Sequence, residues 1–413
     1  MKIPHDVFSV KIKTGHLIYW LLLFLCFYPF LNIFRLPTDT QPNALLFSIP
    51  ILLLSLRKKF PSYYLLGFLL FAVAFITLIF SNLNFSSFLS FSNYVSFLIV
   101  PLAVFFMLKF FGGFSYSFFK NVIYAWGIVA LIQKFIYSNF LGFLLSRSSA
   151  IFTSNGRGVV SLAPEPTYYG SIIILFLVLY FLNFSEKKDY RLLLIMMIQL
   201  VALSVSSTSI LVLASAVGIY FLFIFVNLPI KKILMILGSV IAFALLIAFI
   251  APSFSGSRIY KLVNIVISKP ELILFDQSIS ERFNAVYFSI GSLFHNYGIP
   301  HGYNAYKDYI LKQSEYPENA MFFFNFNIEN YGRILSGFGM GIFELGIFGL
   351  LIPLMIFTSI WRCLKNHSVL FAYILFNLLL FTAMSLNNSL ILFIIGNMIY
   401  LSSKKNEENF SKI

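Results

Sequence analysis

Apolar runs long enough to cross a lipid bilayer recur along the whole chain of 413 residues. A membrane span needs roughly 20 predominantly apolar residues in helical form, and lipid leaves no hydrogen-bond partner for open backbone. The sequence therefore predicts an all-α polytopic membrane protein with about twelve transmembrane helices. The expected spans are residues 17–35, 43–56, 62–80, 89–110, 118–140, 167–184, 190–206, 208–227, 231–251, 337–361, 367–383 and 387–402.

The composition supports a membrane protein and argues against a nucleic-acid partner. Hydrophobic residues make up 59% of the chain and charged residues only 11%, whereas a soluble domain has roughly 25% charged residues. The formal net charge is +14. The basic residues stand at the ends of apolar runs and do not form one continuous patch, so we expect no nucleic-acid binding.

Lysines and arginines alternate between loops in a way that predicts the orientation of the chain. If the N-terminus is cytoplasmic, the short loops on the opposite side, "PTDTQPN", "SNLNFSS", "SSTS" and "SLNN", carry no basic residue. Both termini are then expected in the cytoplasm. The basic residues of the cytoplasmic segments would be Lys2, Lys11, Lys13, Arg57, Lys58, Lys59, Lys109, Lys120, Lys187, Lys188, Arg191, Lys231, Lys232, Arg362, Lys365, Lys404, Lys405 and Lys412.

Two longer segments are expected to face outward and divide the chain. Residues 1–251 would hold helices one to nine with an outer loop at 141–166, residues 252–336 a large outer loop, residues 337–402 the last three helices, and residues 403–413 a cytoplasmic tail. Within the large loop, "SISERFNAVYFSIGSLF" predicts an amphipathic helix. Ser278 and Glu281 have the spacing of a capping box. Its apolar face would be formed by Phe283, Val286, Tyr287, Ile290 and Phe294, and it would either pack on the bundle or lie in the membrane interface.

Four outer arginines are candidates for binding a phosphate group: Arg157, Arg258, Arg282 and Arg333. A guanidinium group stays charged and donates two parallel hydrogen bonds to phosphate oxygens. Arg157 lies between two glycines, and Arg282 lies in the first turn of the predicted loop helix. The alternative is that these side chains are solvated or contact anionic lipid headgroups.

Glu165, Glu344 and two histidines are the candidate acids and bases. Glu165 lies in "SLAPEPTYYG", where Pro166 would begin the sixth span and Glu165 would cap it. It is therefore either a helix cap, or a general base or arginine partner. Glu344 falls inside the tenth span, where an ionisable group is either functional or paired within the bundle. His295 and His301 are either acid–base groups near neutral pH or polar loop surface.

Four stretches follow one another in an order that resembles the O-antigen polymerase and ligase superfamily. They are "GRGVVSLAPEPTYYGSIIILF", "LSVSSTSILVLASA", "SERFNAVYFSIGSLFHNYGIPHGYNAY" and "GMGIFELGIFGLL". The resemblance covers most of Arg157 to Leu351, and it is closer to the polymerase branch, known as Wzy.

The resemblance implies a GT-C-like integral glycosyltransferase of the bacterial inner membrane, acting at the periplasmic face without a metal or cofactor. Its substrates would be undecaprenyl-pyrophosphate-linked glycans, with the growing chain transferred to a new lipid-linked repeat. A chain-length regulator and a flippase are the implied protein partners, besides membrane lipids.

The resemblance also implies roles for particular residues. Arg157 and Arg282 would bind pyrophosphate, with Arg258 and Arg333 as further candidates and Tyr168 as an additional substrate contact. Glu165 and Glu344 match two of the family's motifs, and the ligase relatives use a loop histidine. The base that takes the acceptor's proton is then Glu165, His301 or Glu344.

Three other functions remain open. An O-antigen ligase would use the same donor and pass the glycan to lipid A-core. A polysaccharide flippase or transporter would carry its charges and broken helices near the bilayer midplane. A scaffold subunit of an assembly complex would tolerate the loss of its arginines.

Overall fold

The computed structural model describes residues 5–33, 40–55, 58, 60–61, 64–81, 83–146, 158–225, 264–265, 268–269, 272, 274, 277–323 and 334–410. Within these residues the protein is built from helices, and the only β-type pairing is an isolated bridge between Leu31 and Leu145. The prediction of an all-α protein is confirmed for this part of the chain.

The first half of the chain forms a series of helices that follow the predicted apolar runs closely. They are α1 (His5–Phe27), α2 (Asn43–Ser55), α3 (Tyr64–Phe80), α4 (Phe85–Phe111), α5 (Tyr116–Phe135), α6 (Pro166–Asn183), α7 (Tyr190–Ile198) and α8 (Ser207–Phe225). A π-helical turn, Gln199–Ser204, continues α7. The largest difference is at the first run, where α1 begins at His5 and ends at Phe27, whereas the predicted span ran from residue 17 to residue 35.

The second half contains the helices of the large loop and the C-terminal bundle. They are α11 (Gln277–His295), α12 (Tyr306–Ser314), α13 (Ala320–Phe323), α14 (Gly337–Leu345), α15 (Leu351–Ile360), α16 (His367–Thr382) and α17 (Ser389–Phe410), with a 3-10 segment, Gly346–Leu350, between α14 and α15. The predicted loop helix is confirmed as α11.

Among the described residues, four helical stretches are long and apolar enough to cross a membrane: Phe85–Phe111, Pro166–Asn183, Ser207–Ile224 and Gly337–Cys363. Several others, such as the 13-residue α2, are apolar but shorter than a full span. The expected span at 231–251 lies outside the described residues. The chain thus has the helices of a membrane protein, and the number twelve stays a prediction.

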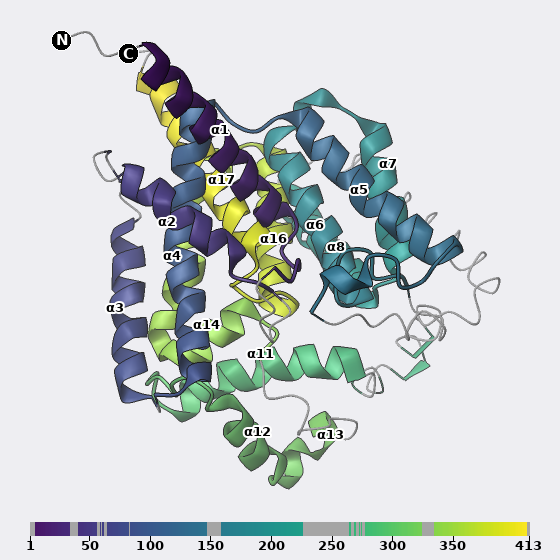
Figure 1. Cartoon of the computed structure of the whole chain (residues 1–413). Helices are drawn as coiled ribbons and strands as arrows, with labels where there is room; N and C mark the ends of the chain where they lie inside the picture. The colour runs from purple at the N-terminus through teal and green to yellow at the C-terminus, as the bar shows by residue number, and fades with distance from the viewer. Residues whose placement is uncertain are drawn as a thin grey trace.

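The molecule has two ends that are formed by different helices (Figure 1). Both termini lie at one end, together with the C-terminal ends of α4 and α17. There Lys109 of α4 and Glu407 of α17 form an ion pair, with 2.7 Å between Nζ and Oε1. The helices α11, α12 and α13 lie at the other end. There the backbone N–H of Tyr303 donates to Ser81 Oγ, just beyond α3, at 3.1 Å. The large loop therefore caps the bundle end opposite the termini.

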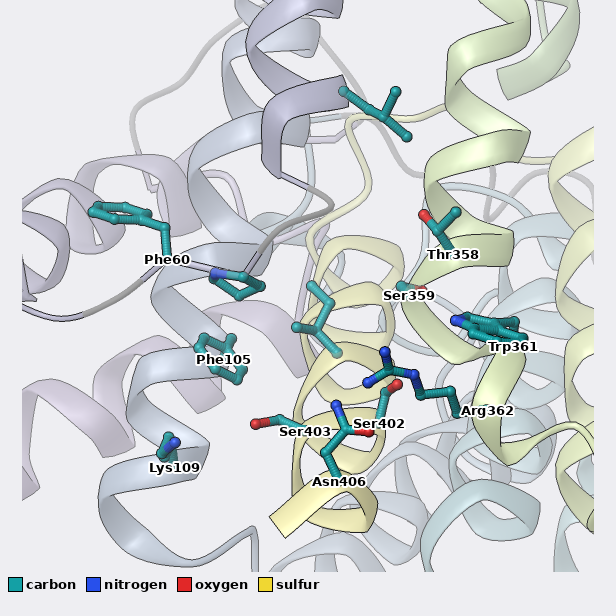
Figure 2. Close-up of a pocket in the computed structure, with 13 residues that line it drawn as sticks. Phe60, Phe105, Lys109, Thr358, Ser359, Trp361, Arg362, Ser402, Ser403 and Asn406 are labelled. Carbon is teal, nitrogen blue, oxygen red and sulfur yellow. The ribbon is translucent and has the colours of Figure 1, made fainter. Parts of the chain in front are cut away.

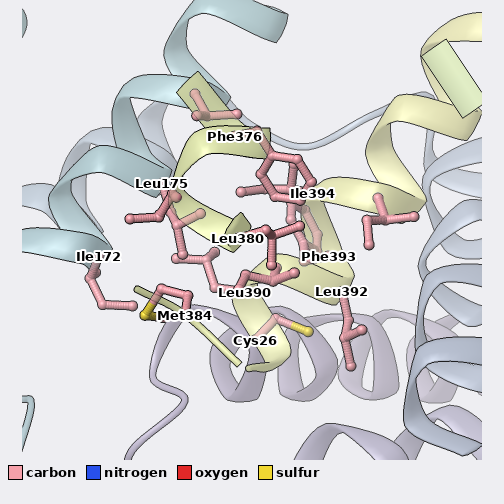
Figure 3. Close-up of a cluster of buried hydrophobic side chains, with 14 of the residues drawn as sticks. Cys26, Ile172, Leu175, Phe376, Leu380, Met384, Leu390, Leu392, Phe393 and Ile394 are labelled. Atoms are coloured by element: carbon pink, nitrogen blue, oxygen red, sulfur yellow. The ribbon is translucent and has the colours of Figure 1, made fainter. Parts of the chain in front are cut away.

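The core of the bundle lies where α1, α6, α16 and α17 meet. Figure 3 shows Cys26 of α1, Ile172 of α6 and Leu380 of α16 converging on residues of α17, and each of these three side chains is fully buried. Small residues permit the close helix crossings that packing in lipid favours. A Cβ at Gly396 of α17 would lie 2.5 Å from the Pro101 carbonyl oxygen of α4.

Candidate functional site

The predicted tenth span is a broken helix, and the break forms the floor of a candidate site. α14 ends at Leu345, and Gly346 adopts φ +60° before the 3-10 segment begins. A Cβ at Gly346 would lie 2.2 Å from the Gly298 carbonyl oxygen, so only glycine permits this approach. The Ile347 N–H donates to that carbonyl at 2.9 Å. The turn after α11 is thereby docked onto the break in the membrane helix.

Two backbone groups of the same turn continue the docking. The N–H groups of His301 and Gly302 donate to the carbonyl oxygens of Phe343 and Glu344, at 3.2 and 3.3 Å. The last carbonyls of a helix have no partner inside the helix, so the turn supplies partners to the end of α14. The motifs "NYGIPHGYN" and "FELG", separate in the sequence, therefore meet in space.

Glu344 is buried at this junction, with 7% of its surface exposed. Its Oε2 accepts a hydrogen bond of 2.7 Å from the hydroxyl of Tyr94, which lies on α4. The partner is a phenol, whereas a salt bridge within the bundle was one of the two expectations. In the part of the chain that the structure describes, the one ion pair is Lys109–Glu407. Glu344 thus holds α4 against α14.

The imidazole of His301 lies flat against the ring of Phe343, with ring centroids 4.5 Å apart and an interplanar angle of 4°. Burial lowers the pKa of His301 below its ordinary value of 6.5, and a hydrogen bond with the backbone of Ser292 partly opposes this shift. Nε2 is buried and has no hydrogen-bond partner among the described residues. We therefore assign the proton to Nδ1, which leaves a neutral ring with its lone pair on Nε2.

Tyr303 and Asn304 fasten the turn to α3 and α4. The Tyr303 hydroxyl donates to the Ala74 carbonyl oxygen at 2.8 Å, and its ring centroid lies 6.1 Å from that of Tyr94. Asn304 Nδ2 donates to Ser87 Oγ at 3.0 Å. The segment that carries His301 is thus held by three separate parts of the fold.

Arg282 lies on the face of α11 that packs toward the bundle. Ala285, Ser289 and Ser292 on this face are almost completely buried, and a Cβ at Gly339 of α14 would lie 2.8 Å from the Ala285 carbonyl oxygen. Arg282, three residues before Ala285, is half-buried. Arg282 therefore lies on the same face of α11 as Ser292, whose backbone forms a hydrogen bond with the His301 side chain.

The predicted apolar face of α11 is turned away from α14. Phe283, Tyr287 and Phe294 are 42%, 47% and 74% exposed, and the rings of Phe283 and Tyr287 stack on each other and against Phe322 of α13. The helix itself was predicted correctly. The face that packs on the bundle is instead the small and polar one, because glycine-bearing α14 accepts a close neighbour.

Glu165 and Tyr168 belong to a second group of residues, on α5, α6 and the π-helical turn. α6 begins at Pro166 with Glu165 at the N-cap, which confirms the predicted boundary, although the Glu165 side chain makes no capping hydrogen bond. Tyr168 is half-buried, with its ring centroid 5.5 Å from that of Phe30.

Gln133 of α5 fixes the segment before α6. Its side chain accepts from the Ser161 N–H at 2.6 Å and donates to the Ser161 carbonyl at 2.9 Å, while Ser161 adopts φ +53°. The Ser161 hydroxyl donates to the Trp126 carbonyl oxygen at 2.7 Å. The start of "SLAPEPTYYG" is therefore clamped to α5, even though it is a loop.

Two glycines bring "SLAPEPTYYG" against "SVSSTS". A Cβ at Gly158 would lie 2.0 Å from the Ser204 carbonyl oxygen, and one at Gly170 would lie 2.5 Å from Ser209 Oγ. The Val159 N–H donates to the Leu203 carbonyl at 2.9 Å. The first two motifs of the resemblance thus form one packed unit.

Of the nine candidate site residues that the sequence predicted, the structure describes six: Glu165, Tyr168, Arg282, His295, His301 and Glu344. Arg157, Arg258 and Arg333 lie outside the described residues. Tyr94 and Gln133 were missed, because a lone tyrosine or glutamine in an apolar run carries no local signal of its distant partner. The chain matches no protein-family model, no curated protein and no solved structure.

Proposed function

We propose that the chain is a polysaccharide polymerase of the O-antigen type, a glycosyltransferase of the bacterial inner membrane. It transfers the growing glycan from undecaprenyl pyrophosphate to the next lipid-linked repeat unit. The GT-C-like architecture of about twelve spans, the cytoplasmic termini and the periplasmic active site are parts of this proposal.

The observation that carries the proposal is the docking of the His301 turn on the broken helix α14. Breaks in membrane helices are tolerated where they border protein or a polar cavity. Here the break brings a buried carboxyl group, Glu344, and an unpartnered imidazole acceptor, His301 Nε2, to one junction. Both come from motifs on which the resemblance rests.

In this proposal His301 is the base that takes the proton of the acceptor hydroxyl. Its neutral ring and free lone pair on Nε2 suit that role. Glu344 is a positioning residue, because its carboxyl group is engaged by Tyr94. Glu165 is assigned to the N-cap of α6, the position that it occupies in the structure.

Arg282 stabilises the pyrophosphate that leaves when the anomeric carbon is attacked, with Arg157, Arg258 and Arg333 as further candidates. Arg282 and Ser292 are ten residues apart on the same helix, roughly 15 Å along its axis. The arginine that binds pyrophosphate and the backbone group that hydrogen-bonds the base, His301, therefore belong to the same helix, α11. Removal of one such donor commonly costs about 10²- to 10³-fold in rate. The displacement needs no metal or cofactor in this scheme.

Deletion of the gene in its host, followed by gel analysis of lipopolysaccharide, tests the proposal. We expect core carrying a single repeat and no ladder, because flipping and ligation would continue without polymerisation. The wild-type gene should restore the ladder, and Arg282→Ala should not. Lys307→Ala is the matched control, since Lys307 is an exposed cation on the neighbouring helix α12; it should restore the ladder.

Other outcomes would contradict the proposal. Bare core without any repeat would indicate a ligase or a flippase. An unchanged ladder after deletion would remove O-antigen polymerisation from consideration. A ladder restored equally by Arg282→Ala and by the wild type would remove the role of Arg282.

A further inference from the structure

A cavity of about 490 Å³ lies at the end of the bundle that holds the termini, opposite the helices of the large loop (Figure 2). Its walls come from the start of α3, the last turns of α4, the end of α15 and the C-terminal half of α17. Its size is that of a site for a small organic molecule or a lipid headgroup. We call it the Arg362 cavity.

The polar groups of the Arg362 cavity favour an anion. Figure 2 shows the Arg362 side chain directed toward Ser402 and Asn406 of α17, with Lys109 on α4. Lys109 is paired with Glu407. Within the described residues, Arg362 has no ion pair, and its measured contact is with the ring of its neighbour Trp361, 5.6 Å away. The three charges sum to one positive charge, which an anion would balance.

Part of the lining of the cavity is apolar. Leu66, Phe105 and Ile399 line it, with Phe105 and Ile399 buried. A freely soluble anion would gain nothing from these side chains. A molecule that joins a phosphate to a hydrocarbon chain would contact both the polar and the apolar lining residues, because burial of apolar surface adds roughly 25 cal/mol per Å².

The depth of the two cations in the membrane identifies the occupant further. Lys109 stands near the C-terminal end of α4, an apolar helix of 27 residues, Phe85–Phe111, and Arg362 lines the same cavity as Lys109. Such a helix is about 40 Å long, whereas the hydrocarbon core is about 30 Å thick. The last residues therefore reach the headgroup layer. Trp361, 52% exposed beside Arg362, is typical of that layer.

We propose that the Arg362 cavity binds the phosphate group of an anionic phospholipid, with its glycerol and upper acyl chain against the apolar lining residues. A zwitterionic lipid is a poorer occupant, because its ammonium group would lie beside Arg362. This site is independent of the proposed transferase function. Basic pockets between membrane helices are known to hold anionic headgroups.

Binding of phosphatidylglycerol and phosphatidylethanolamine to the full-length protein in detergent, measured by native mass spectrometry, tests this inference. We expect phosphatidylglycerol to bind more tightly. Arg362→Gln should weaken its binding about fivefold, because one basic residue near a headgroup contributes about that factor. Lys365→Gln, which removes an exposed charge three residues away and outside the cavity, should change binding little.

A second variant tests whether lipid binding requires the space of the cavity as well as its positive charge. Ser403→Phe keeps both cations and fills the space, so it should abolish the preference for phosphatidylglycerol while an unchanged melting temperature without lipid shows intact folding. Equal binding of both lipids would overturn the inference, and so would an equal loss in Lys365→Gln. Binding of glycerol 3-phosphate as tight as that of the lipid would also overturn it, because the apolar lining residues would then contribute nothing.

Discussion

Single buried polar side chains fix the geometry of this protein at both groups of site residues. Gln133 satisfies both backbone groups of Ser161, and Tyr94 satisfies Glu344. A buried polar group left without its partner costs about 1–3 kcal/mol. These contacts therefore fix the loop before α6 and the position of α14 against α4, although each is made by a single side chain.

The lowered pKa of His301 predicts the pH dependence of activity. A base must be unprotonated, and burial holds the pKa of His301 below 6.5, so activity should persist at pH 6.5 and fall only as pH drops further. His301→Gln should lower turnover by about 10²- to 10⁴-fold. His295→Gln is the control, since His295 is exposed at the end of α11, and it should keep the wild-type profile. An acid limb with its midpoint above 6.5 would contradict the assignment of His301.

Structural roles that depend on neighbouring residues could be predicted from the sequence, whereas contacts between distant residues could not. The chemistry of proline is local, so Pro166 marked the start of α6 and placed Glu165 at its cap. Tyr94 and Glu344 are 250 positions apart, and neither sequence neighbourhood indicates the other. Their contact depends on the fold of the whole bundle.

At the scale of elements, the bounds of α11 followed from the sequence, and the face of α11 that packs on the bundle did not. The apolar periodicity of residues 278–294 gave α11 within one residue at each end. The periodicity did not predict which face of α11 is buried, because that depends on the partner helix α14, which carries Gly337, Gly339 and Gly341. A glycine-rich partner favours a small, close neighbour over a bulky aromatic one.

The break between α14 and α15 was also missed, because the apolar run of the tenth span continues through it. Gly349 is essential to that break. A Cβ there would lie 2.3 Å from the backbone of Gly341, where neither chain segment can give way.

Gly349→Ala should therefore lower the free energy of unfolding by about 1–3 kcal/mol or more. The control is Gly218→Ala on α8, where a Cβ meets nothing within 4 Å; it should be neutral or stabilise by up to about 1 kcal/mol. Thermal unfolding of the detergent-solubilised protein measures both. An equal melting temperature for Gly349→Ala and the wild type would show that the 3-10 segment does not pack against α14 in this way.

At the scale of the whole molecule, the two ends have different chemistry. The end with the termini holds paired and unpaired cations and the Arg362 cavity, and the opposite end holds the His301 turn and the helices of the large loop. Which end faces the cytoplasm stays a prediction of the positive-inside rule.

The central claim is that the junction of the His301 turn and α14 carries out glycosyl transfer. Its most direct test is elongation of a synthetic undecaprenyl-pyrophosphate-linked repeat unit by the purified protein in proteoliposomes, with products resolved by mass spectrometry. The account predicts products of two and more repeats with the wild type, and none above background with His301→Gln. Lack of elongation by the wild type on its own host's repeat unit, or equal elongation by His301→Gln, would contradict it.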